Sequence, residues 1–360
     1  MSTLPLKFGV VGCGRVSKNH LQALTSGRIP SQLVAVTDVD VAKAKAKGTE
    51  YKVPYYTDYH EMMRQHPEID VINIMTPTGY HARHVIDLAR YGKHIIVEKP
   101  MALRVEDCDA MMAACQQYGG RLFVVKQNRF NRAVVAARQA FEDGRFGKMV
   151  MGTVRVRWRR TQEYYESDNW HGTWELDGGV MSQQASHHLD LLQWFMGPIE
   201  SMQCISATRL MDIEVEDTAV ATFRFTSGAL GAYEATVAAR PEDLEGSLSL
   251  LGENGSVIIG GHAVNKLQYW KFKDARPEDE EIQREFSQDV PNVYGHGHTP
   301  YIGHVIEAIT TGTPGLVEGP EGRKDIAILT ALYESAASNG AYVPPGTPII
   351  NSRLGKPGAA

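Results

Sequence analysis

A glycine-rich segment near the start of the chain has the residue types and spacing that bind the phosphates of a dinucleotide. The segment is Gly12-Cys13-Gly14-Arg15-Val16-Ser17, and it follows an apolar run and precedes a helical pattern. Gly12 permits a tight turn and Gly14 a close approach of a pyrophosphate, which lies at a helix N-terminus where free amides favour anions. Ser17 stands at the third glycine of the usual motif, where a small serine also lets the helix pack on the strand. A helix-opening turn without a ligand is the alternative interpretation.

An acidic residue stands where such a fold contacts the adenosine ribose. Asp38 directly follows the apolar run Leu33 to Thr37, at close to the roughly 20-residue offset after the glycine motif at which a carboxylate meets the ribose hydroxyls. A carboxylate accepts a hydrogen bond from a 2′-hydroxyl but repels a 2′-phosphate, so NAD is favoured over NADP. The alternative is that Asp38 caps the next helix.

The elements that must position these residues alternate in type over the first third of the chain. Val- and Ile-rich runs predict strands at Leu6 to Val11, Leu33 to Thr37, Val71 to Met75, His94 to Val97 and Arg121 to Lys126. Helical patterns lie between them at about residues 16–26, 40–48, 58–66, 80–92 and 103–118. This alternation predicts an α/β class domain, a Rossmann-like doubly wound parallel sheet over residues 1–126.

The pattern changes after residue 148 to strands joined by glycine-containing turns. Strands are predicted at Met149 to Trp158, Thr218 to Phe225, Leu230 to Val237, Ser247 to Leu251 and Ser256 to Ile259, with helices at about residues 183–195, 300–311 and 321–338. Residues 127–360 are therefore expected to form an α+β domain with a large, mainly antiparallel, open-faced sheet that binds substrate and mediates oligomerisation.

The composition excludes several partners. The net charge of −5 gives no basic field for a nucleic acid, and no run of about 18 apolar residues predicts a membrane span. The four cysteines form no CxxC pair, which argues against a disulfide framework or a thiolate zinc site. We therefore expect a cytoplasmic protein that binds a small molecule.

Further motifs make the chain resemble the Gfo/Idh/MocA oxidoreductases over nearly its whole length. They are Thr76-Pro77-Thr78-Gly79-Tyr80-His81, Glu98-Lys99-Pro100, Gln127-Asn128-Arg129 and the segment from Gly178-Gly179 to Asp190. The resemblance implies cofactor contacts from Thr76, Pro77, His81, Glu98, Lys99 and Gln127, and a cis bond between Lys99 and Pro100. A lysine at the carboxyl end of a parallel strand also points into the crevice where such sheets bind ligands, and its ammonium could stabilise an alkoxide.

The resemblance also implies that His187 is the general base. A neutral imidazole takes a hydroxyl proton while hydride leaves the same carbon. Residues 183–190 are predicted to be helical, with Gln183, His187 and Asp190 on one face. Gln183 stands where many relatives carry an aspartate, and we expect it to hydrogen-bond the substrate. His188 faces elsewhere and is expected to be structural.

A metal site is the alternative for these histidines. Its ligands could come from His187, His188, Asp190, His296 and His298. Their spacing matches no open metal site, and the nicotinamide already accepts the electrons. No metal is therefore predicted.

A segment before the histidines suggests the substrate. It contains Trp158-Arg159-Arg160-Thr161-Gln162-Glu163-Tyr164-Tyr165, and the resemblance extends here to the branch that oxidises carbon 3 of UDP-N-acetyl-D-glucosaminuronate. Arginine forks bind diphosphate or carboxylate, and tyrosines contact sugar or uracil. The predicted substrate contacts are Lys99, Arg160, Tyr164, Tyr165, Gln183 and His187. The alternative is that the arginines form a solvated strand face and the tryptophans belong to the core.

The predicted function is NAD-dependent oxidation of this UDP-sugar in the synthesis of bacterial surface polysaccharide, including lipopolysaccharide. A dehydrogenase of a free polyol such as inositol is the nearest alternative, and a non-catalytic NAD-sensing regulator is another. Pairing of the open sheet faces is expected to give a homo-oligomer, a tetramer built as a dimer of dimers.

Overall fold

The structure is a computed structural model that describes residues 5–290 and 293–356. The chain forms two compact units, and each is described by itself. The first contains the residues up to Val125 together with His298–Ile326, and the second contains Lys126–Gly297 and the residues from Ala327 onward. Sequence analysis had placed residues 298–326 in the second domain. They join the first unit because Val124 N–H donates to the Val317 carbonyl at 2.8 Å and helix α10 (His298–Thr311) packs on helix α1 (Ser17–Thr25).

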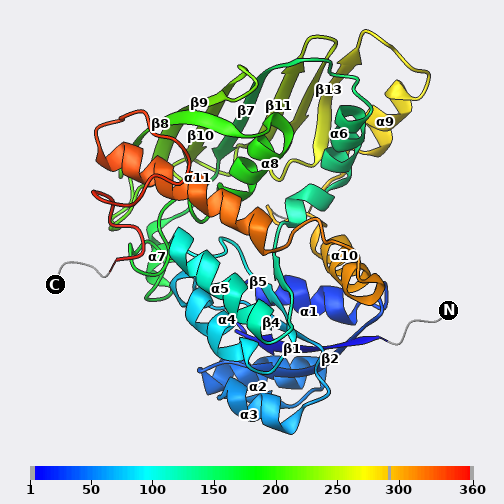
Figure 1. Ribbon diagram of the computed structural model, residues 1–360, viewed down its shortest axis with the longest axis vertical. Coiled ribbons are helices and arrows are strands. Elements are labelled where there is room, and N and C mark those ends of the chain that lie inside the picture. The colour runs from blue at the N-terminus through cyan, green and yellow to red at the C-terminus, as the bar shows by residue number, and fades with distance from the viewer. Residues whose placement is uncertain (1–4, 291–292, 357–360) are drawn as a thin grey trace. The chain divides into compact units, whose positions relative to one another are not determined.

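A six-stranded parallel sheet forms the centre of the first unit, in the order β3-β2-β1-β4-β5-β6 (Figure 1). Its strands are β1 (Leu6–Val11), β2 (Ser31–Thr37), β3 (Tyr55–Tyr56), β4 (Val71–Ile74), β5 (His94–Val97) and β6 (Leu122–Val124). The order reverses between β1 and β4, as in a doubly wound fold. The central strands are buried on both faces, which requires the nearly continuous Val and Ile runs seen in the sequence. The predicted Rossmann fold is confirmed.

Helices connect these strands. Besides α1 and α10, this unit contains α2 (Val41–Tyr51), α3 (Tyr59–Gln65), α4 (His81–Ala89) and α5 (Val105–Gln117), with a short 3₁₀ turn η1 (Thr78–Tyr80) before α4. Asp40 and Asp58 cap α2 and α3 by accepting hydrogen bonds from first-turn amides. A long helix, α11 (Gly319–Ala337), follows α10.

A seven-stranded sheet forms the core of the second unit, in the order β13-β12-β11-β7-β10-β9-β8. The strands are β7 (Met149–Arg157), β8 (Ile199–Ala207), β9 (Thr218–Phe225), β10 (Leu230–Thr236), β11 (Glu245–Gly252), β12 (Gly255–Gly260) and β13 (Lys266–Phe272). Neighbouring strands run antiparallel except β7 and β10, which are parallel. The sheet is therefore mainly antiparallel, as predicted, although β8 and β13 were not foreseen.

Four helices and a 3₁₀ turn complete the second unit. They are η2 (Gln127–Phe130), α6 (Arg132–Glu142), α7 (Gln162–Glu166), α8 (Ser186–Met196) and α9 (Asp279–Glu285). Helix α8 packs against β7 and β11 and covers one face of the sheet. In the described part of the chain, no helix combines the length and apolar character needed to cross a membrane.

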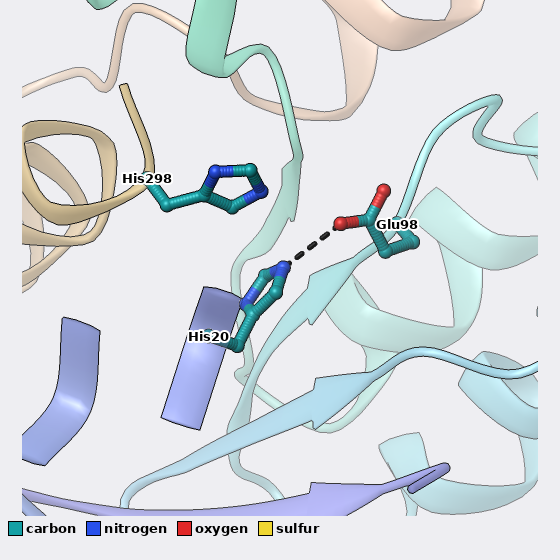
Figure 2. A group of neighbouring side chains, drawn as sticks. All are labelled: His20, Glu98 and His298. Atoms are coloured by element: carbon teal, nitrogen blue, oxygen red, sulfur yellow. Dashed lines mark hydrogen bonds and ion pairs between the residues drawn. The ribbon is translucent and has the colours of Figure 1, made fainter. Parts of the chain in front are cut away.

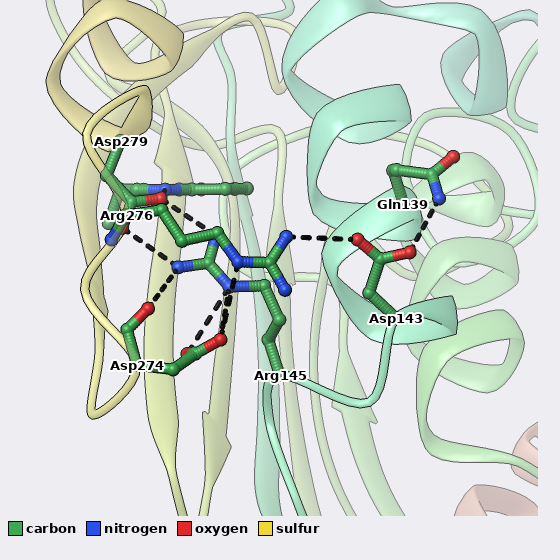
Figure 3. Close-up of polar contacts among 7 residues, drawn as sticks. Gln139, Asp143, Arg145, Asp274, Arg276 and Asp279 are labelled. Carbon is green, nitrogen blue, oxygen red and sulfur yellow. Dashed lines mark hydrogen bonds and ion pairs between the residues drawn. The ribbon is translucent and has the colours of Figure 1, made fainter.

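A buried arginine in the α6–β7 connection, Arg145, forms ion pairs with residues that follow β13 (Figure 3). Both terminal nitrogens of Arg145 donate to the Asp279 carboxylate at 2.8 Å, and its guanidinium lies 4.0 Å from the centre of the Phe272 ring. Asp279 also accepts from the Trp270 indole at 2.7 Å. The buried charge is thus matched by a bidentate carboxylate partner, which is the geometry that tolerates burial.

Candidate functional site

The glycine-rich loop has the geometry of a phosphate cradle. Gly12 has φ +101°, and a Cβ at this position would lie 2.5 Å from the carbonyl oxygen of Met75, so only glycine fits. At Gly14 a Cβ would meet nothing within 4 Å, which leaves space at the loop for a ligand. Ser17 Oγ donates to the Gly14 carbonyl at 2.7 Å, so the serine closes the turn where the usual motif has a third glycine.

Helix α1 begins directly after this loop, with Val16 in the N-cap position. Its first turn contains no acidic residue, and no side chain in the described ranges caps it. Ser17 N–H and Asn19 N–H donate to the carbonyls of Gly14 and Val16 at 3.2 and 3.0 Å. The positive end of the helix dipole, with no acidic side chain in the first turn, is therefore what suits the pyrophosphate role.

The carboxylate of Asp38 lies across the glycine-rich loop. It accepts from Cys13 N–H at 2.7 Å and from Asp40 N–H at 2.9 Å, whereas Asp40 caps α2. The alternative in which Asp38 itself caps the helix is therefore wrong. A carboxylate has acceptor sites beyond these two, and its charge next to the loop disfavours a 2′-phosphate. Burial, with the charge of Asp38, raises the pKa of the Cys13 thiol to about 12, so this cysteine is inert.

The loop after β4 is braced by two histidines. Thr76 Oγ1 lies 2.9 Å from His84 Nδ1. The buried ring of His81 lies between two backbone carbonyls, with Nδ1 2.9 Å from that of Pro100 and Nε2 2.8 Å from that of Thr76. His81 therefore ties the loop containing Thr76 and Pro77 to the loop after β5, and its predicted contact with the cofactor stays a prediction.

Glu98 and Lys99 directly follow strand β5. Glu98 is buried and its carboxylate accepts from His20 and from Lys99 N–H, whereas Lys99 is half-buried and its bond to Pro100 is cis. Gly12, Asp38 and Thr76 follow the ends of β1, β2 and β4, so all these residues lie at the carboxyl edge of one parallel sheet. This edge is where open α/β sheets bind ligands.

These features fit a dinucleotide. The glycine cradle and the positive end of α1 suit the pyrophosphate, and the Asp38 carboxylate suits an unphosphorylated ribose. Gly12, Gly14, Arg15, Val16 and Asp38 are the residues that would hold these groups.

His187 lies in the first turn of α8 and is buried. Asp190, one turn later, receives a bidentate ion pair from Arg129, with distances of 2.9 and 2.6 Å, and lies 3.6 Å from Lys126 Nζ. Burial raises the pKa of Asp190, but these two cations outweigh it and lower the pKa overall. Asp190 is thus the anchor of α8 rather than a partner of the substrate.

Gln183 is not on the helix, which corrects the predicted shared face. Residues 180–185 form turns after the paired glycines, and α8 begins only at Ser186. The side-chain nitrogen of Gln183 donates to Asp177 at 2.5 Å, and the same carboxylate accepts from Gly172 N–H at 2.7 Å. Sequence reasoning missed Asp177, although a buried aspartate directly before Gly178-Gly179 was a possible signal.

The predicted substrate segment separates into two faces. Arg160 lies between the rings of Trp158 and Tyr164, with its guanidinium carbon 5.5 Å from each ring centre. Tyr165 is buried beside it, and burial raises the pKa of its hydroxyl. Arg157 instead forms an ion pair with Glu234 at the opposite face of the sheet. For this arginine, the alternative interpretation of a solvated strand face therefore holds.

Several buried side-chain oxygens in the described part of the second unit have no protein hydrogen-bond partner. Gln184 Oε1 and Ser186 Oγ have no hydrogen-bond partner among the described residues, and the same holds for Gln127 Oε1 in η2. Buried polar atoms rarely stay unpaired in a working protein. Gln127 was a predicted contact, whereas the roles of Gln184 and Ser186 were missed because nothing local distinguishes them from helix-start residues.

His188 packs in the core, and the described side chains that could share a metal ion lie outside α8. The buried ring of His188 packs edge-on against Trp158 with centres 5.7 Å apart, and burial lowers its pKa to about 3. Within the described residues, the group of side chains close enough to share an ion is His20, Glu98 and His298, and it contains none of the histidines of α8.

A dinucleotide cradle at the edge of a parallel sheet, with a lysine at its rim, defines a nicotinamide-dependent oxidoreductase. Residues 6–126 match the model of the oxidoreductase family with an NAD-binding Rossmann fold, and residues 138–344 match that of its C-terminal alpha/beta domain. The chain belongs to this Gfo/Idh/MocA family and is an NAD-dependent dehydrogenase of the kind that acts on a CH–OH group.

Two solved structures are similar over nearly the whole chain. The WlbA dehydrogenase from Bordetella pertussis, in complex with NADH and UDP-GlcNAcA, is 40% identical with a TM-score of 0.89, covering 97% of this chain and 100% of that one. The WlbA dehydrogenase from Chromobacterium violaceum, with the same ligands, is 39% identical with a TM-score of 0.87, covering 95% and 96%.

Curated relatives match over shorter stretches. Inositol 2-dehydrogenase from Rhizobium meliloti is 29% identical over 59% of this chain, and the match spans 62% of that enzyme. A diene dehydrogenase from Comamonas testosteroni is 31% identical over 52% of this chain, and the match spans 47% of its length.

Proposed function

We propose that this dehydrogenase oxidises the carbon 3 hydroxyl of UDP-N-acetyl-D-glucosaminuronate to a ketone. The observation that carries the proposal is Arg160, which lies between Trp158 and Tyr164 beside the buried Tyr165. A guanidinium flanked by aromatic rings suits an anionic nucleotide sugar, since the fork binds phosphate or carboxylate and the rings contact sugar or base. The similarity to the two WlbA dehydrogenases supports the same substrate.

The proposed chemistry divides between named side chains. NAD, when bound, accepts the hydride from carbon 3. His187 takes the proton of the hydroxyl as general base, and Lys99 stabilises the developing alkoxide. Gln183 hydrogen-bonds the sugar, and the short contact with Asp177 holds its amide in one orientation.

The anionic substrate explains why a local cation is needed. The chain has a net charge of −5, so its overall field repels a molecule with a diphosphate and a carboxylate. Arg160 Nη1 donates to the Arg159 carbonyl at 2.6 Å and to Asp243 Oδ1 at 3.4 Å. Both bonds use the same terminal nitrogen, so the N–H groups on Nε and Nη2 are the donors proposed for the ligand.

A dehydrogenase of a free polyol such as inositol is the second candidate, because curated inositol dehydrogenases are among the relatives. A free polyol offers no diphosphate for Arg160.

Initial rates of NAD reduction should be measured with UDP-N-acetylglucosaminuronate, UDP-N-acetylglucosamine and myo-inositol. We expect turnover with the first alone, and at least ~10-fold loss of kcat/KM in Arg160→Ala, as for a lost charge-assisted contact. Turnover of myo-inositol that is insensitive to Arg160→Ala would replace the proposal by the second candidate.

The exposed face of the second sheet supports a proposed homo-oligomer, a dimer of dimers. Leu230, Met151 and Leu251 are direct neighbours across β10, β7 and β11 and are 52%, 37% and 37% exposed. Ile205 and Val220 form a second exposed pair across β8 and β9. Apolar rows of this kind on an open sheet face are typical of protein interfaces.

The proposed setting is the cytoplasm of a bacterium that makes surface polysaccharide. NAD and a nucleotide sugar are cytoplasmic metabolites, and all four cysteines are free thiols in buried positions.

A further inference from the structure

A buried carboxylate stands directly before the lysine of the proposed reaction. Glu98 is 5% exposed, and its Oε2 accepts from Lys99 N–H at 3.0 Å. Its Oε1 lies 2.8 Å from His20 Nε2, and Figure 2 shows the two side chains directed at one another. The carboxylate is therefore part of the interior support of Lys99.

Asn73 and Glu98 lie at the two ring nitrogens of His20. The amide nitrogen of Asn73 lies 3.3 Å from Nδ1. An ionised carboxylate can only accept, so Nε2 of His20 carries the proton of the 2.8 Å contact with Glu98. The side chains of Asn73 and His20 are fully buried, which holds this arrangement in place.

The three residues come from the elements that build the cofactor site. His20 belongs to α1, which begins at the phosphate loop, and Asn73 belongs to β4, which precedes the Thr76 loop. Glu98 follows β5. The hydrogen-bonded chain thus connects α1, which follows the glycine-rich loop, to the segment that contains Lys99 directly after β5.

Glu98 is a negative charge at neutral pH. Burial raises its pKa, but the hydrogen bond with His20 and the charge of Lys99 outweigh burial and lower the pKa to about 2. The other groups that face Glu98 are uncharged, because burial lowers the pKa of His81 and of His298, the latter to about 3, and raises that of Tyr301. The cation next to this charge is Lys99.

A metal ion is the competing interpretation of this cluster. One ligand atom each of His20, Glu98 and His298 lie within 4.8 Å of one another. A metal on Nε2 of His20 requires that nitrogen to lose its proton and the 2.8 Å hydrogen bond to Glu98 to break. The existing hydrogen bonds favour a protonic network.

We propose that Glu98, held by His20 and Asn73, is a positioning residue that keeps the Lys99 side chain protonated and directed at the reacting oxygen. The claim that Lys99 is directed at the reacting oxygen rests on the proposed function. The claim that Glu98 keeps Lys99 protonated does not rest on it, and it can be measured without substrate.

The first experiment measures Lys99 directly. Wild type and Glu98→Gln are treated with limiting acetic anhydride at a series of pH values, and acetylation of Lys99 is quantified by mass spectrometry. Glutamine keeps the shape but removes the charge, so Lys99 should become reactive at a pH lower by about one unit, as expected on losing a nearby opposite charge. Lys45, which is exposed on α2, should show the same acetylation profile in both proteins.

The second experiment uses turnover of whichever sugar the wild type oxidises. Glu98→Gln should lower kcat by about 10-fold or more and move the alkaline limb of the pH profile to lower pH by the same amount as the labelling. NAD affinity should change less than about threefold, since both carboxylate oxygens are already bonded to His20 and to Lys99 N–H. His20→Gln, whose amide can still donate to Glu98, should keep more activity than His20→Leu. His94→Leu, at the opposite end of β5, should behave as wild type.

The outcomes separate the claims. Unchanged Lys99 labelling in a folded Glu98→Gln protein would overturn the inference, whatever the substrate. Stoichiometric zinc in the purified protein, with activity lost to a chelator, would overturn it in favour of a metal site. Shifted labelling in a protein whose wild type oxidises no UDP-sugar would support the Glu98 role and sink only the proposed function.

Discussion

At the residue scale, the two adjacent buried histidines of α8 are expected to have different roles. His187 is the proposed base, whereas His188 packs edge-on against Trp158. His187→Ala should therefore lower kcat by about 100-fold or more, because a general base is lost. His188→Leu should leave kcat unchanged and should not lower the free energy of unfolding, since it buries no unpaired polar atom. Steady-state kinetics and urea unfolding of both variants check this, and equal losses of activity would move the base elsewhere.

The preference for NAD over NADP is also expected to depend on a single residue, Asp38. Asp38→Asn keeps an oxygen for Cys13 N–H but removes the charge next to the ribose. We expect the affinity for NAD to fall by about 10-fold or less and the preference for NAD over NADP to shrink by more than that, because the repulsion of a 2′-phosphate disappears. Titration of both nucleotides by calorimetry measures the ratio. An unchanged ratio would mean that Asp38 does not face the ribose.

At the element scale, the Arg145 network makes a pH-dependent contribution to stability. Hydrogen bonds from Arg145 and neighbouring groups outweigh burial and lower the pKa of Asp279 below its unfolded value. Its stabilisation is therefore complete above the unfolded pKa of about 4 and is lost as the pH falls through the folded pKa.

Asp279→Asn should accordingly cost about 2 kcal/mol at pH 7 and less below pH ~4, since a buried charged hydrogen bond is lost. Unfolding can be followed by tryptophan fluorescence, because Trp270 bonds the same carboxylate. Asp289→Asn is the matched control, because its partner Lys266 holds it at the exposed surface and it should show no measurable effect. A cost for Asp279→Asn that does not vary with pH would contradict the ionic explanation.

The accuracy of the sequence prediction also varies by element. The parallel sheet was predictable because its buried strands are short apolar runs between helical patterns, and the glycine loop because its motif is local. The start of α8 was not, because Gln183 fits the helical spacing while its side chain is held by Asp177. The packing of residues 298–326 on the first unit depends on pairing between Val124 and Val317, which are far apart in sequence.

At the scale of the whole molecule, the apolar rows on the open sheet predict self-association. Replacing Leu230 and Met151 by lysine places like charges in the proposed interface and should convert a tetramer to smaller species. Light scattering after gel filtration measures the mass. Ile86→Lys, at an exposed site on α4, should leave the mass unchanged. A double variant that keeps the wild-type mass would place the interface elsewhere.

The assignment of the reacting carbon is tested most directly by isotope transfer. The protein is incubated with NAD and UDP-N-acetylglucosaminuronate that carries deuterium at carbon 3, and the reduced nucleotide is analysed by mass spectrometry. The account predicts a nucleotide one mass unit heavier than with unlabelled sugar and a 3-keto sugar that has lost its deuterium. Reduced nucleotide without deuterium, or none at all, would contradict it.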